Sequence, residues 1–545
     1  MELYDVLESH LEAFKNVMTT FIRRIAPYFP LIALVCILLL GAYLRVYRIS
    51  EYMTFLGDEG RDMMVIKRMI IDHKFTLLGP TASVGGFFLG PIYYYFMLPF
   101  VWASGLNPAG AAFMVALFGI ATIYVVYRLG KDVFDEWVGL SAAALFAVSP
   151  LVIAYSRSSW NPNLVPFFST LLIYMLWRSV ARNEPKLLLW VGVCLGIGLQ
   201  LHYLFLFLFP VVGIWYLLMG RRTDWLKYYA LGILGFILGY GPFLAFELRH
   251  GFPNTISIYN FLLEGKGTGF DASTFWNTIS DVSYRVFGRL MFRLPPPEQW
   301  VNVAPIWQSI WTWGTRITIA ASMALILGFI SGRLSLTKKT DAKKGKHPSW
   351  YYGAILFVLW FCVPLVLFGF YKKGIYDYYF GLFFAFPFLC TALILRYIKI
   401  GSIGGMLVYA ALISLLYFNW EGRPFKFPPN NQLGQAQMIA KSAYEKTEGK
   451  PYNFALMATS NSDHVYRYFF EIWGDPPVPI ENAVIDPDRK SVTDQLIVIC
   501  ELQECKPLGN SLWEIAGFGR AEIAGEWQVS FVKVMKLVHY KEGSL

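Results

Sequence analysis

Charged residues are scarce in this 545-residue chain, where Asp, Glu, Lys and Arg together make up 15%, against about 25% in soluble globular domains. Hydrophobic residues make up 56% and aromatic residues 18%. Apolar runs such as 30–40 and 201–218 would be insoluble unless most of them faced lipid. The composition therefore excludes a disordered protein, argues against a soluble enzyme and indicates a multi-pass membrane protein.

Cysteine is also scarce, and none of the six cysteines lies in a CxxC motif or in a Cys/His metal-binding spacing. Four of them fall inside apolar runs. Cys500 and Cys505 instead lie in a polar region, and a loop this short can bring two Cα atoms within the ~4.4–6.8 Å that a disulfide requires. In an oxidising location we expect a disulfide, and two free thiols are the alternative.

The few charges are unevenly distributed, because 29 of the 84 charged residues lie in 420–545, less than a quarter of the chain. Residues 420–545 are therefore predicted to form a small α/β domain outside the membrane, with helices over 431–447 and 464–472. Its predicted strands cover 452–459 and 495–500, with a strand or hairpin over 527–538. Residues 27–419 would form an all-α membrane body, and 1–26 an amphipathic helix on the cytoplasmic leaflet.

Eleven membrane spans are predicted from the apolar runs. The run 91–103 is excluded because its length of about 20 Å is short for a hydrocarbon core of about 30 Å, so we place it in the outer interface. The predicted spans are 27–47, 109–129, 136–155, 163–181, 187–202, 204–219, 227–247, 314–332, 350–370, 378–396 and 402–419.

Basic residues set the predicted orientation in the plasma membrane. With these spans, all five basic clusters between Arg128 and Lys399 fall on the cytoplasmic side, as the positive-inside bias requires. This placement explains the net charge of +10 without nucleic acid as a partner. The N-terminus is then cytoplasmic, and 48–108, 248–313 and 420–545 face outward.

The first outer loop carries two adjacent carboxylates in the sequence Gly57-Asp58-Glu59-Gly60, directly after the first span. At the edge of the low-dielectric region, desolvation can raise a carboxylate pKa and produce a competent base. The alternative is a solvated loop that supplies acidic residues to a helix N-terminus.

Other polar and aromatic residues are predicted on the same side of the membrane. Tyr93 and Tyr94 form an aromatic shelf for a sugar or part of an interfacial belt. Arg157, Asn161 and Asn163 present a guanidinium and two amides to an anion or polyol, or belong to an ordinary turn.

Lys372 and Lys373 lie on a predicted outer loop, where the positive-inside bias disfavours lysine. An anionic ligand such as a phosphate is the simplest reason for their presence, although two interfacial lysines would also anchor the loop to lipid headgroups. His202 lies at the same predicted depth. These charges together indicate a phosphorylated substrate at the outer membrane surface.

These residues resemble those of the GT-C glycosyltransferases that use polyprenyl-phosphate sugars, in particular the protein O-mannosyltransferases (glycosyltransferase family 39) and the lipid A aminoarabinose transferases. The resemblance covers roughly residues 27–400. It rests on Asp58-Glu59, the Gly-Pro-aromatic segment 90–95, the Ser-Arg loop 156–163, His202 and Lys372–Tyr379.

The resemblance implies a GT-C fold and an inverting transfer of a sugar from a polyprenyl-phosphate carrier to an extracytoplasmic lipid, glycan or protein. Asp58 would be the general base, with Glu59 beside it. No soluble cofactor and no dedicated metal site are expected, although a carboxylate such as Asp58 can hold a divalent ion. The donor phosphate would be bound by His202, Lys372, Lys373 and Arg157, and the substrates by Arg61, Tyr93, Tyr94, Asn161, Asn163, Tyr376 and Tyr379.

Two positions depart from the aminoarabinose transferases, which have Lys-Pro where this chain has Gly90-Pro91 and an Asp where it has Asn161. Their sugar and acceptor therefore do not carry over. Three alternatives stay open: a transporter or flippase of lipid-linked sugars, a sensor or scaffold anchored by the membrane body, and a polysaccharide polymerase or ligase. The carboxylates in outer loops and the absence of duplicated halves argue against a transporter.

Overall fold

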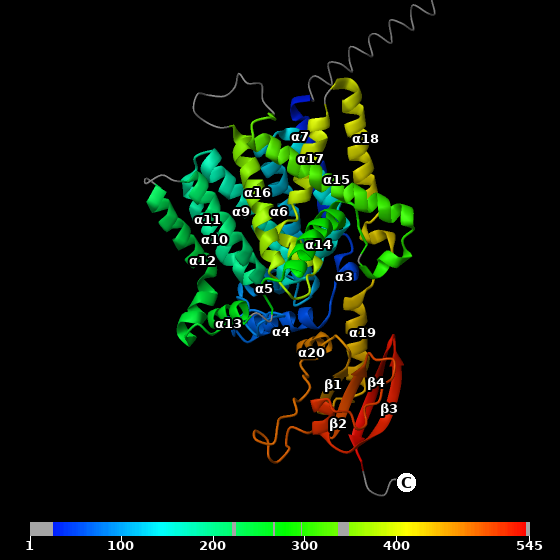
Figure 1. Cartoon of the computed structure of the whole chain (residues 1–545). Helices are drawn as coiled ribbons and strands as arrows, with labels where there is room; N and C mark the ends of the chain where they lie inside the picture. The colour runs from blue at the N-terminus through cyan, green and yellow to red at the C-terminus, as the bar shows by residue number, and fades with distance from the viewer. Residues whose placement is uncertain are drawn as a thin grey trace, which may run out of the picture.

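The computed structural model describes residues 26–220, 225–264, 267–295, 297–335, 348–399 and 401–540. A helical body is joined to a smaller C-terminal domain that lies at one end of the helix bundle (Figure 1). Residues 1–25, most of the predicted amphipathic helix, lie outside the described part of the chain.

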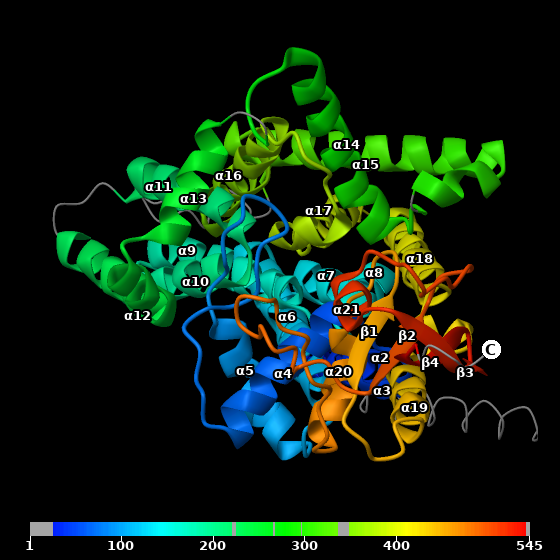
Figure 2. The same ribbon diagram turned by 90° about the horizontal axis from the view of Figure 1, so that it is seen from below.

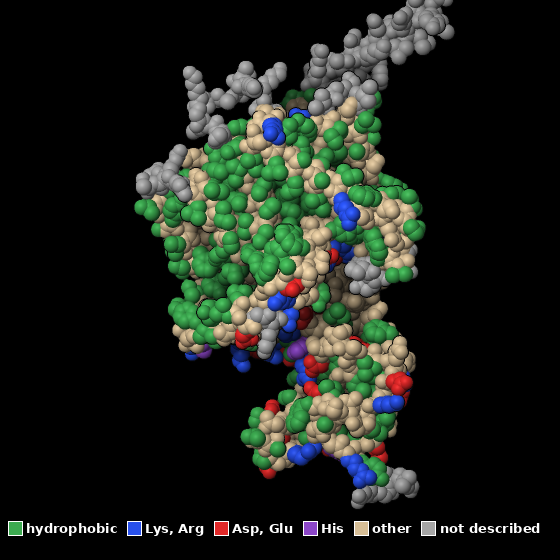
Figure 3. Space-filling model, in the orientation of Figure 1, with side chains coloured by type: hydrophobic (Ala, Val, Ile, Leu, Met, Phe, Trp, Pro, Cys, Tyr) green, Lys and Arg blue, Asp and Glu red, His purple; other side chains and the backbone are tan. Residues whose placement is uncertain are grey.

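Helices occupy all eleven predicted span positions. Six helical segments in the described residues are long and apolar enough to cross a membrane, and other apolar helices are shorter, so the number of crossings stays a prediction. A broad band of hydrophobic side chains covers the body in Figure 3, as a lipid-facing surface requires. The helices are α2 (Phe29–Val46), α6 (Ala109–Val133), α7 (Glu136–Val148), α8 (Pro150–Tyr155), α9 (Val165–Ala181), α10 (Leu188–Leu201), α11 (Leu208–Met219), α12 (Leu226–His250), α15 (Pro305–Ile330), α16 (Ser349–Gly369), α17 (Phe386–Ile398) and α18 (Gly401–Trp420).

Helix α17 begins at Phe386, eight residues later than the predicted span. The intervening residues include the 3₁₀ helix η8 (Asp377–Leu382). Pro387 stands in the first turn of α17, where its fixed φ suits a helix start and its missing N–H costs nothing. The loop before α17 is therefore longer than predicted and takes part in the site described below.

Shorter helices gather at the end of the bundle that faces the C-terminal domain (Figure 1). They are α3 (Ile49–Tyr52), α4 (Gly57–Ile71), α5 (Ile92–Ala103), α13 (Pro253–Leu263) and, beside them, α14 (Ala272–Met291).

Both ends of α5 lie close to the C-terminal domain. Near its start, the Tyr94 hydroxyl donates to Asp62 of α4, and α4 packs on the helix α20 (His464–Ile472) of that domain. Just beyond its end, the Leu106 carbonyl accepts a hydrogen bond from the Tyr468 hydroxyl. This arrangement favours the interfacial placement of 91–103.

The C-terminal domain is a four-stranded sheet with helices. Its strand order is β1-β2-β4-β3, with β1 parallel to β2 and the other pairs antiparallel. The helices predicted over 431–447 and 464–472 are present, the third predicted strand is a hairpin that begins at Ala521, and Cys500 and Cys505 form a disulfide. The elements are α19 (Gln432–Glu445), β1 (Asn453–Met457), α20 (His464–Ile472), β2 (Gln495–Cys500), α21 (Trp513–Phe518), β3 (Ala521–Val529) and β4 (Val532–His539).

The domain covers only part of the body. Figure 2 shows α19 and α20 over α3 and α4, whereas α12 lies to the side, away from the domain. The part of the first outer loop that forms α3 and α4 thus lies between the membrane body and the C-terminal domain.

Membrane orientation can be tested with single cysteines in a variant whose four free cysteines are replaced. Ser104→Cys at the end of α5 and Lys441→Cys on α19 are exposed positions, and both should react with a membrane-impermeant thiol reagent in intact cells. Ser331→Cys, at the predicted cytoplasmic end of α15, should react only after permeabilisation. Protection of Lys441→Cys in intact cells would reverse the predicted orientation of the domain.

Candidate active site

The two adjacent carboxylates have different surroundings at the start of α4. Glu59 is buried and accepts a hydrogen bond from the Leu56 N–H at 3.0 Å, which caps the helix. Burial raises the pKa of Glu59 to about 7. Asp58 is exposed and forms an ion pair with Arg61, with 2.9 Å between Oδ1 and Nη1. Glu59 therefore supports the helix start, and Asp58 is the accessible carboxylate.

A third carboxylate, Asp62, was not singled out in the sequence. It is fully buried, and it accepts hydrogen bonds from the Tyr94 hydroxyl at 2.9 Å and from Arg61 Nη2 at 2.8 Å. Burial raises its pKa to about 6. Because Asp62 follows Asp58 by one helical turn, the i, i+4 spacing was the signal that could have identified it. Arg61 is held between the two carboxylates.

Two polar cavities meet at Asp58. The first, here called the domain cavity, has a volume of about 480 Å³ and lies between the body and the C-terminal domain. The second, here called the arginine cavity, has a volume of about 70 Å³. The domain cavity is lined by Thr54, Leu56, Gly57, Asp58, Glu59, Ala154, Tyr155, Ser158, Trp160, Asn163, Ser460, Asn461 and Ser462; the arginine cavity includes Asp58, Arg61, Thr81, Ser83, Trp160, Asn161, His202, Tyr203 and Tyr378.

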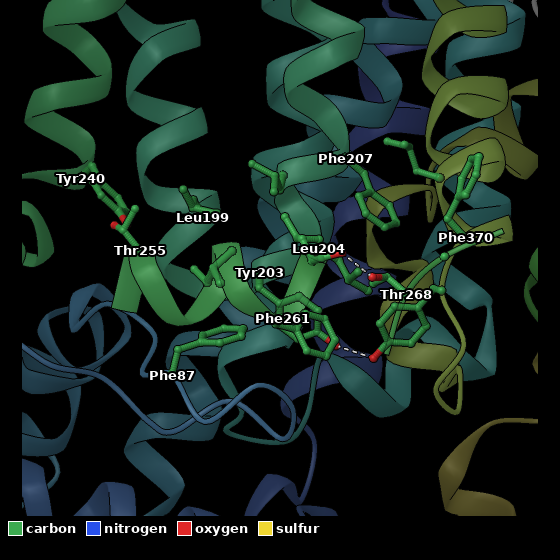
Figure 4. Close-up of a pocket in the computed structure, with 16 residues that line it drawn as sticks. Phe87, Leu199, Tyr203, Leu204, Phe207, Tyr240, Thr255, Phe261, Thr268 and Phe370 are labelled. Atoms are coloured by element: carbon green, nitrogen blue, oxygen red, sulfur yellow. Dashed lines mark hydrogen bonds between the residues drawn. The ribbon is translucent and has the colours of Figure 1, made fainter. Parts of the chain in front are cut away.

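A third cavity, here called the apolar groove, adjoins the arginine cavity, because Tyr203 lines both. Its volume is about 470 Å³ and most of its wall is aromatic or aliphatic, with Phe87, Phe261 and Phe207 around it (Figure 4). The hydroxyls of Tyr203 and Tyr371 share a hydrogen bond of 2.8 Å at its wall. An apolar chain could therefore lie next to the polar site.

His202, which the sequence predicts to bind the donor phosphate, lines the arginine cavity. Its Nδ1 accepts a hydrogen bond from the Leu204 N–H at 3.2 Å, so the proton of the neutral imidazole is on Nε2. The side chain is buried. Neutral His202 can thus donate one hydrogen bond to an oxygen in the cavity.

Asn161 and Asn163 lie in different cavities. Asn161 lines the arginine cavity and donates through Nδ2 to the Leu201 carbonyl at 2.6 Å. Asn163 lines the domain cavity and donates through Nδ2 to the Ser158 carbonyl at 2.8 Å. Its Oδ1 is buried and has no hydrogen-bond partner among the described residues.

The prediction that Arg157 binds the donor phosphate is wrong in this structure. The side chain is 1% exposed, and its two Nη atoms donate to the carbonyls of Leu44 and Tyr47 at 2.8 and 2.7 Å. These carbonyls lie at the C-terminal end of α2, where helical carbonyls lack an N–H partner within the helix and can accept from a side chain. Arg157 therefore joins the first span to the loop 156–163.

Three tyrosines predicted to contact substrate are instead buried supports. Tyr93 shares a hydrogen bond of 2.7 Å with the Ser159 hydroxyl, and Tyr94 donates to Asp62. Tyr379 is 3% exposed and accepts a hydrogen bond from the Tyr203 hydroxyl at 3.2 Å. A buried aromatic residue whose hydroxyl has a protein partner has little surface left for a substrate.

The remaining predicted residues lie on the exposed loop that precedes η8. Lys372 and Lys373 are exposed and line neither cavity at Asp58. Lys372 lies beside the apolar groove, because a Cβ on Gly269 in the groove wall would lie 3.0 Å from Lys372 Nζ. Tyr376 is exposed, with its ring stacked on Tyr378.

The C-terminal domain contributes directly to this site, which the sequence did not predict. The Gly57 N–H donates to Asn461 Oδ1 at 3.0 Å, and Asn461 Nδ2 donates to Glu501 Oε1 at 2.9 Å. Cβ atoms on Gly57 and Gly60 would lie 2.1 Å from Ser462 Oγ and 2.5 Å from the His464 carbonyl oxygen. The glycines on either side of the carboxylates therefore let the domain approach the backbone of α4.

Substituting Gly60 tests this contact. Gly60→Ala would force a Cβ against backbone atoms of His464 and Val465, and overpacking of this kind costs about 1–3 kcal/mol. We expect a lower unfolding temperature and easier proteolysis between body and domain. Gly241→Ala in α12, where a Cβ meets nothing within 4 Å, is the matched control, and equal behaviour of the two variants would contradict the close approach.

No group of three His, Cys, Asp or Glu side chains in the described ranges is arranged to hold a metal ion. The site offers Asp58 as a carboxylate base, and in the arginine cavity Arg61 and His202 serve as hydrogen-bond donors. In the domain cavity, Asp58 is accompanied by hydroxyl and amide side chains such as Ser158, Asn163 and Asn461.

The helical architecture is similar to that of membrane proteins with the GT-C fold. A crystal structure of ArnT from Cupriavidus metallidurans bound to undecaprenyl phosphate matches 93% of this chain and 98% of its own, with a TM-score of 0.57 and 11% identity. The apo structure of the same protein matches with a TM-score of 0.58 and 10% identity over 94% of this chain and 98% of its own. The predicted fold class is confirmed.

Sequence comparisons find similarity to mannosyltransferases over part of the chain. Residues 90–245 match the family model described as dolichyl-phosphate-mannose-protein mannosyltransferase. Two putative mannosyltransferases of Bacillus subtilis (strain 168), YkcB and YycA, are each 24% identical over 196 residues, or 35% of this chain. The match spans about a quarter of their length, 27% and 28% respectively.

Proposed function

We propose that this protein is an inverting glycosyltransferase that moves a sugar from a polyprenyl-phosphate carrier to an extracytoplasmic acceptor. The observation that carries the proposal is the position of Asp58 at the wall shared by the domain cavity and the arginine cavity, of which only the second is also lined by Arg61 and His202. The family match to the mannosyltransferases and the fold of ArnT, whose structure holds undecaprenyl phosphate, support the same class.

The arginine cavity is the proposed site of the donor phosphate. Arg61 and His202 supply N–H donors there, and the adjoining apolar groove suits the polyprenyl chain. Lys372, beside the groove, and the exposed Lys373 that follows it would attract the phosphate from the membrane surface. Arg61 would stabilise the negative charge that develops on the leaving phosphate.

The domain cavity is then left for the acceptor. Asp58 would take the proton of the acceptor hydroxyl, the oxygen would form a bond to the anomeric carbon, and the bond from that carbon to the phosphate oxygen would break. The phosphate leaves with the electron pair. A single displacement from the face opposite the phosphate inverts the anomeric centre, so the sugar would lie between the acceptor hydroxyl, held at Asp58, and the donor phosphate.

Mass spectrometry of the purified protein tests the donor. A polyprenyl phosphate should copurify with wild type, and a synthetic polyprenyl-phosphate sugar should be consumed. The Asp58→Asn variant should retain the lipid and consume the donor about 10²–10⁴ times more slowly. Absence of both polyprenyl phosphate and donor consumption in wild type would refute the proposed function and favour a transporter or sensor. Donor consumption with chain extension of a glycan would indicate a polymerase or ligase.

The lysines are tested by the double variant Lys372→Ala with Lys373→Ala. Because both side chains are exposed, they should affect capture of the donor more than the chemical step, and we expect its KM to rise roughly tenfold with little change in kcat. Lys490→Ala with Lys506→Ala, two exposed lysines of the C-terminal domain, is the control. Unchanged donor kinetics with lower stability in detergent would assign the pair to membrane anchoring instead.

A further inference from the structure

We infer that the domain cavity is an acceptor site for an uncharged carbohydrate, and that the loop between β1 and α20 of the C-terminal domain selects that acceptor. The inference rests on the proposed function for the direction of transfer. It goes further by naming the chemical class of the acceptor and the part of the chain that recognises it.

The chemistry of the cavity wall favours a neutral polyol. Hydroxyl and amide groups come from Ser158, Asn163, Ser460 and Asn461, and no lysine, arginine or histidine among the described residues lines the cavity. Such groups both donate and accept hydrogen bonds, as sugar hydroxyls require. An anionic acceptor would meet Asp58 and Glu59, and the neighbouring cation Arg61 lines the arginine cavity instead and is already paired with two carboxylates.

Two aromatic side chains add an apolar surface to this polar wall. Tyr155 and Trp160 line the cavity together with the polar residues. An amphipathic aromatic ring offers a flat apolar face and a polar edge, which matches the C–H face and the hydroxyl rim of a pyranose. The combination is less suited to a wholly apolar ligand, because burying the unpaired polar groups would be costly.

One polar atom in the wall lacks a partner. Asn163 Oδ1 is buried, and no described group donates a hydrogen bond to it, although its Nδ2 is held by the Ser158 carbonyl. A buried unsatisfied acceptor is costly unless a ligand or water supplies a donor. A sugar hydroxyl in the cavity would supply that hydrogen bond.

The C-terminal part of the wall is held rigidly against the catalytic carboxylate. Asn461 connects Gly57, the residue before Asp58, with Glu501, which also accepts a hydrogen bond from the Tyr466 hydroxyl at 2.7 Å. Ser460 and Ser462 lie on either side of Asn461 and line the same cavity. Residues of the domain thus lie at a fixed place opposite Asp58, where they can discriminate between acceptors.

Two matched tryptophan substitutions test the cavity. Ser460 and Thr459 are neighbouring exposed residues of the loop, but only Ser460 lines the cavity. Ser460→Trp should fill the cavity, whereas Thr459→Trp adds the same side chain outside it. Thermal unfolding of both variants in lipid nanodiscs checks that they remain folded, and Ser460→Ala provides a milder variant if Ser460→Trp does not.

Saturation-transfer NMR in nanodiscs gives the binding readout, with the methyl glycosides of mannose, glucose and galactose and their 6-phosphates as probes. At least one neutral glycoside should receive saturation from wild type and from Thr459→Trp, and its signal should fall at least tenfold in Ser460→Trp. Stronger signals from the phosphates, no signal from any neutral glycoside, or an unchanged signal in Ser460→Trp would overturn the inference.

The amount of copurified polyprenyl phosphate shows whether a failed glycoside-binding test refutes the acceptor class or the proposed donor. Ser460→Trp should retain polyprenyl phosphate at the wild-type level, because the apolar groove does not include Ser460. Lipid retained without binding of a neutral glycoside would refute only the acceptor class. Loss of lipid from wild type, with glycoside binding intact, would refute the donor assignment and leave the carbohydrate site.

Discussion

Replacing Asp58 by asparagine should lower the rate of sugar transfer by about 10²–10⁴, the usual loss on removing a general base. The amide has almost the same shape but cannot accept the hydroxyl proton. Asp58 is exposed at the wall shared by the domain and arginine cavities, so the substitution buries no new polar group. The variant should therefore stay folded and retain donor lipid.

Glu59→Gln is the matched control for Asp58→Asn. The glutamine oxygen can still accept the hydrogen bond from the Leu56 N–H that Glu59 accepts, so the start of α4 should persist. We expect a much smaller loss of transfer. If Glu59→Gln abolished transfer while Asp58→Asn did not, the base would be the buried carboxylate, whose pKa is raised to about 7.

Replacing Asp377 by asparagine should destabilise the protein by about 1–3 kcal/mol, because its ion pairs are partly buried and their loss should cost more than that of a surface pair and less than that of a fully buried one. Its carboxylate joins Arg285 and Arg289 of α14, with both N–O distances at 2.7 Å. All three side chains are less than one-fifth exposed. Asparagine would leave two largely buried guanidinium groups without a full counter-charge.

Asp281→Asn is the control, because it measures the stability lost when an exposed ion pair on the same helix is removed. Asp281 contacts only one of the two arginines, Arg285, at 3.1 Å, and its side chain is 53% exposed. Thermal unfolding in lipid nanodiscs should show a large shift for Asp377→Asn and a small one for Asp281→Asn. Equal shifts would mean that the Asp377 pairs contribute no more than the surface contact.

The Asp377 substitution should also reduce transfer. Asp377 is followed directly by Tyr378, which lines the arginine cavity, and by Tyr379, whose ring packs near His202 at a centroid distance of 5.2 Å. Loss of the anchor to α14 would let these aromatic residues shift from the proposed phosphate site.

Composition and apolar run length were enough to predict the membrane body and the positions of its helices. Apolar runs of span length have few stable alternatives to a helix in lipid, because every backbone hydrogen bond must be made internally. The polar segment after the first span pointed to Asp58 and Glu59 together, and the resemblance to the GT-C glycosyltransferases singled out Asp58. The elements of the C-terminal domain followed from local periodicity and turn residues.

Which polar residues line the cavities depends on long-range contacts of the folded chain, which the local sequence does not reveal. Arg157 bonds to carbonyls 110 and 113 positions away, and Asn461 bonds to Gly57 across 404 positions. Such partners leave no mark on local sequence, so Arg157, Tyr93, Tyr94 and Tyr379 looked available when they are buried. For the same reason Asp62, Asp377 and the loop at Asn461 went unnoticed, because burial and long-range contacts give these side chains their roles.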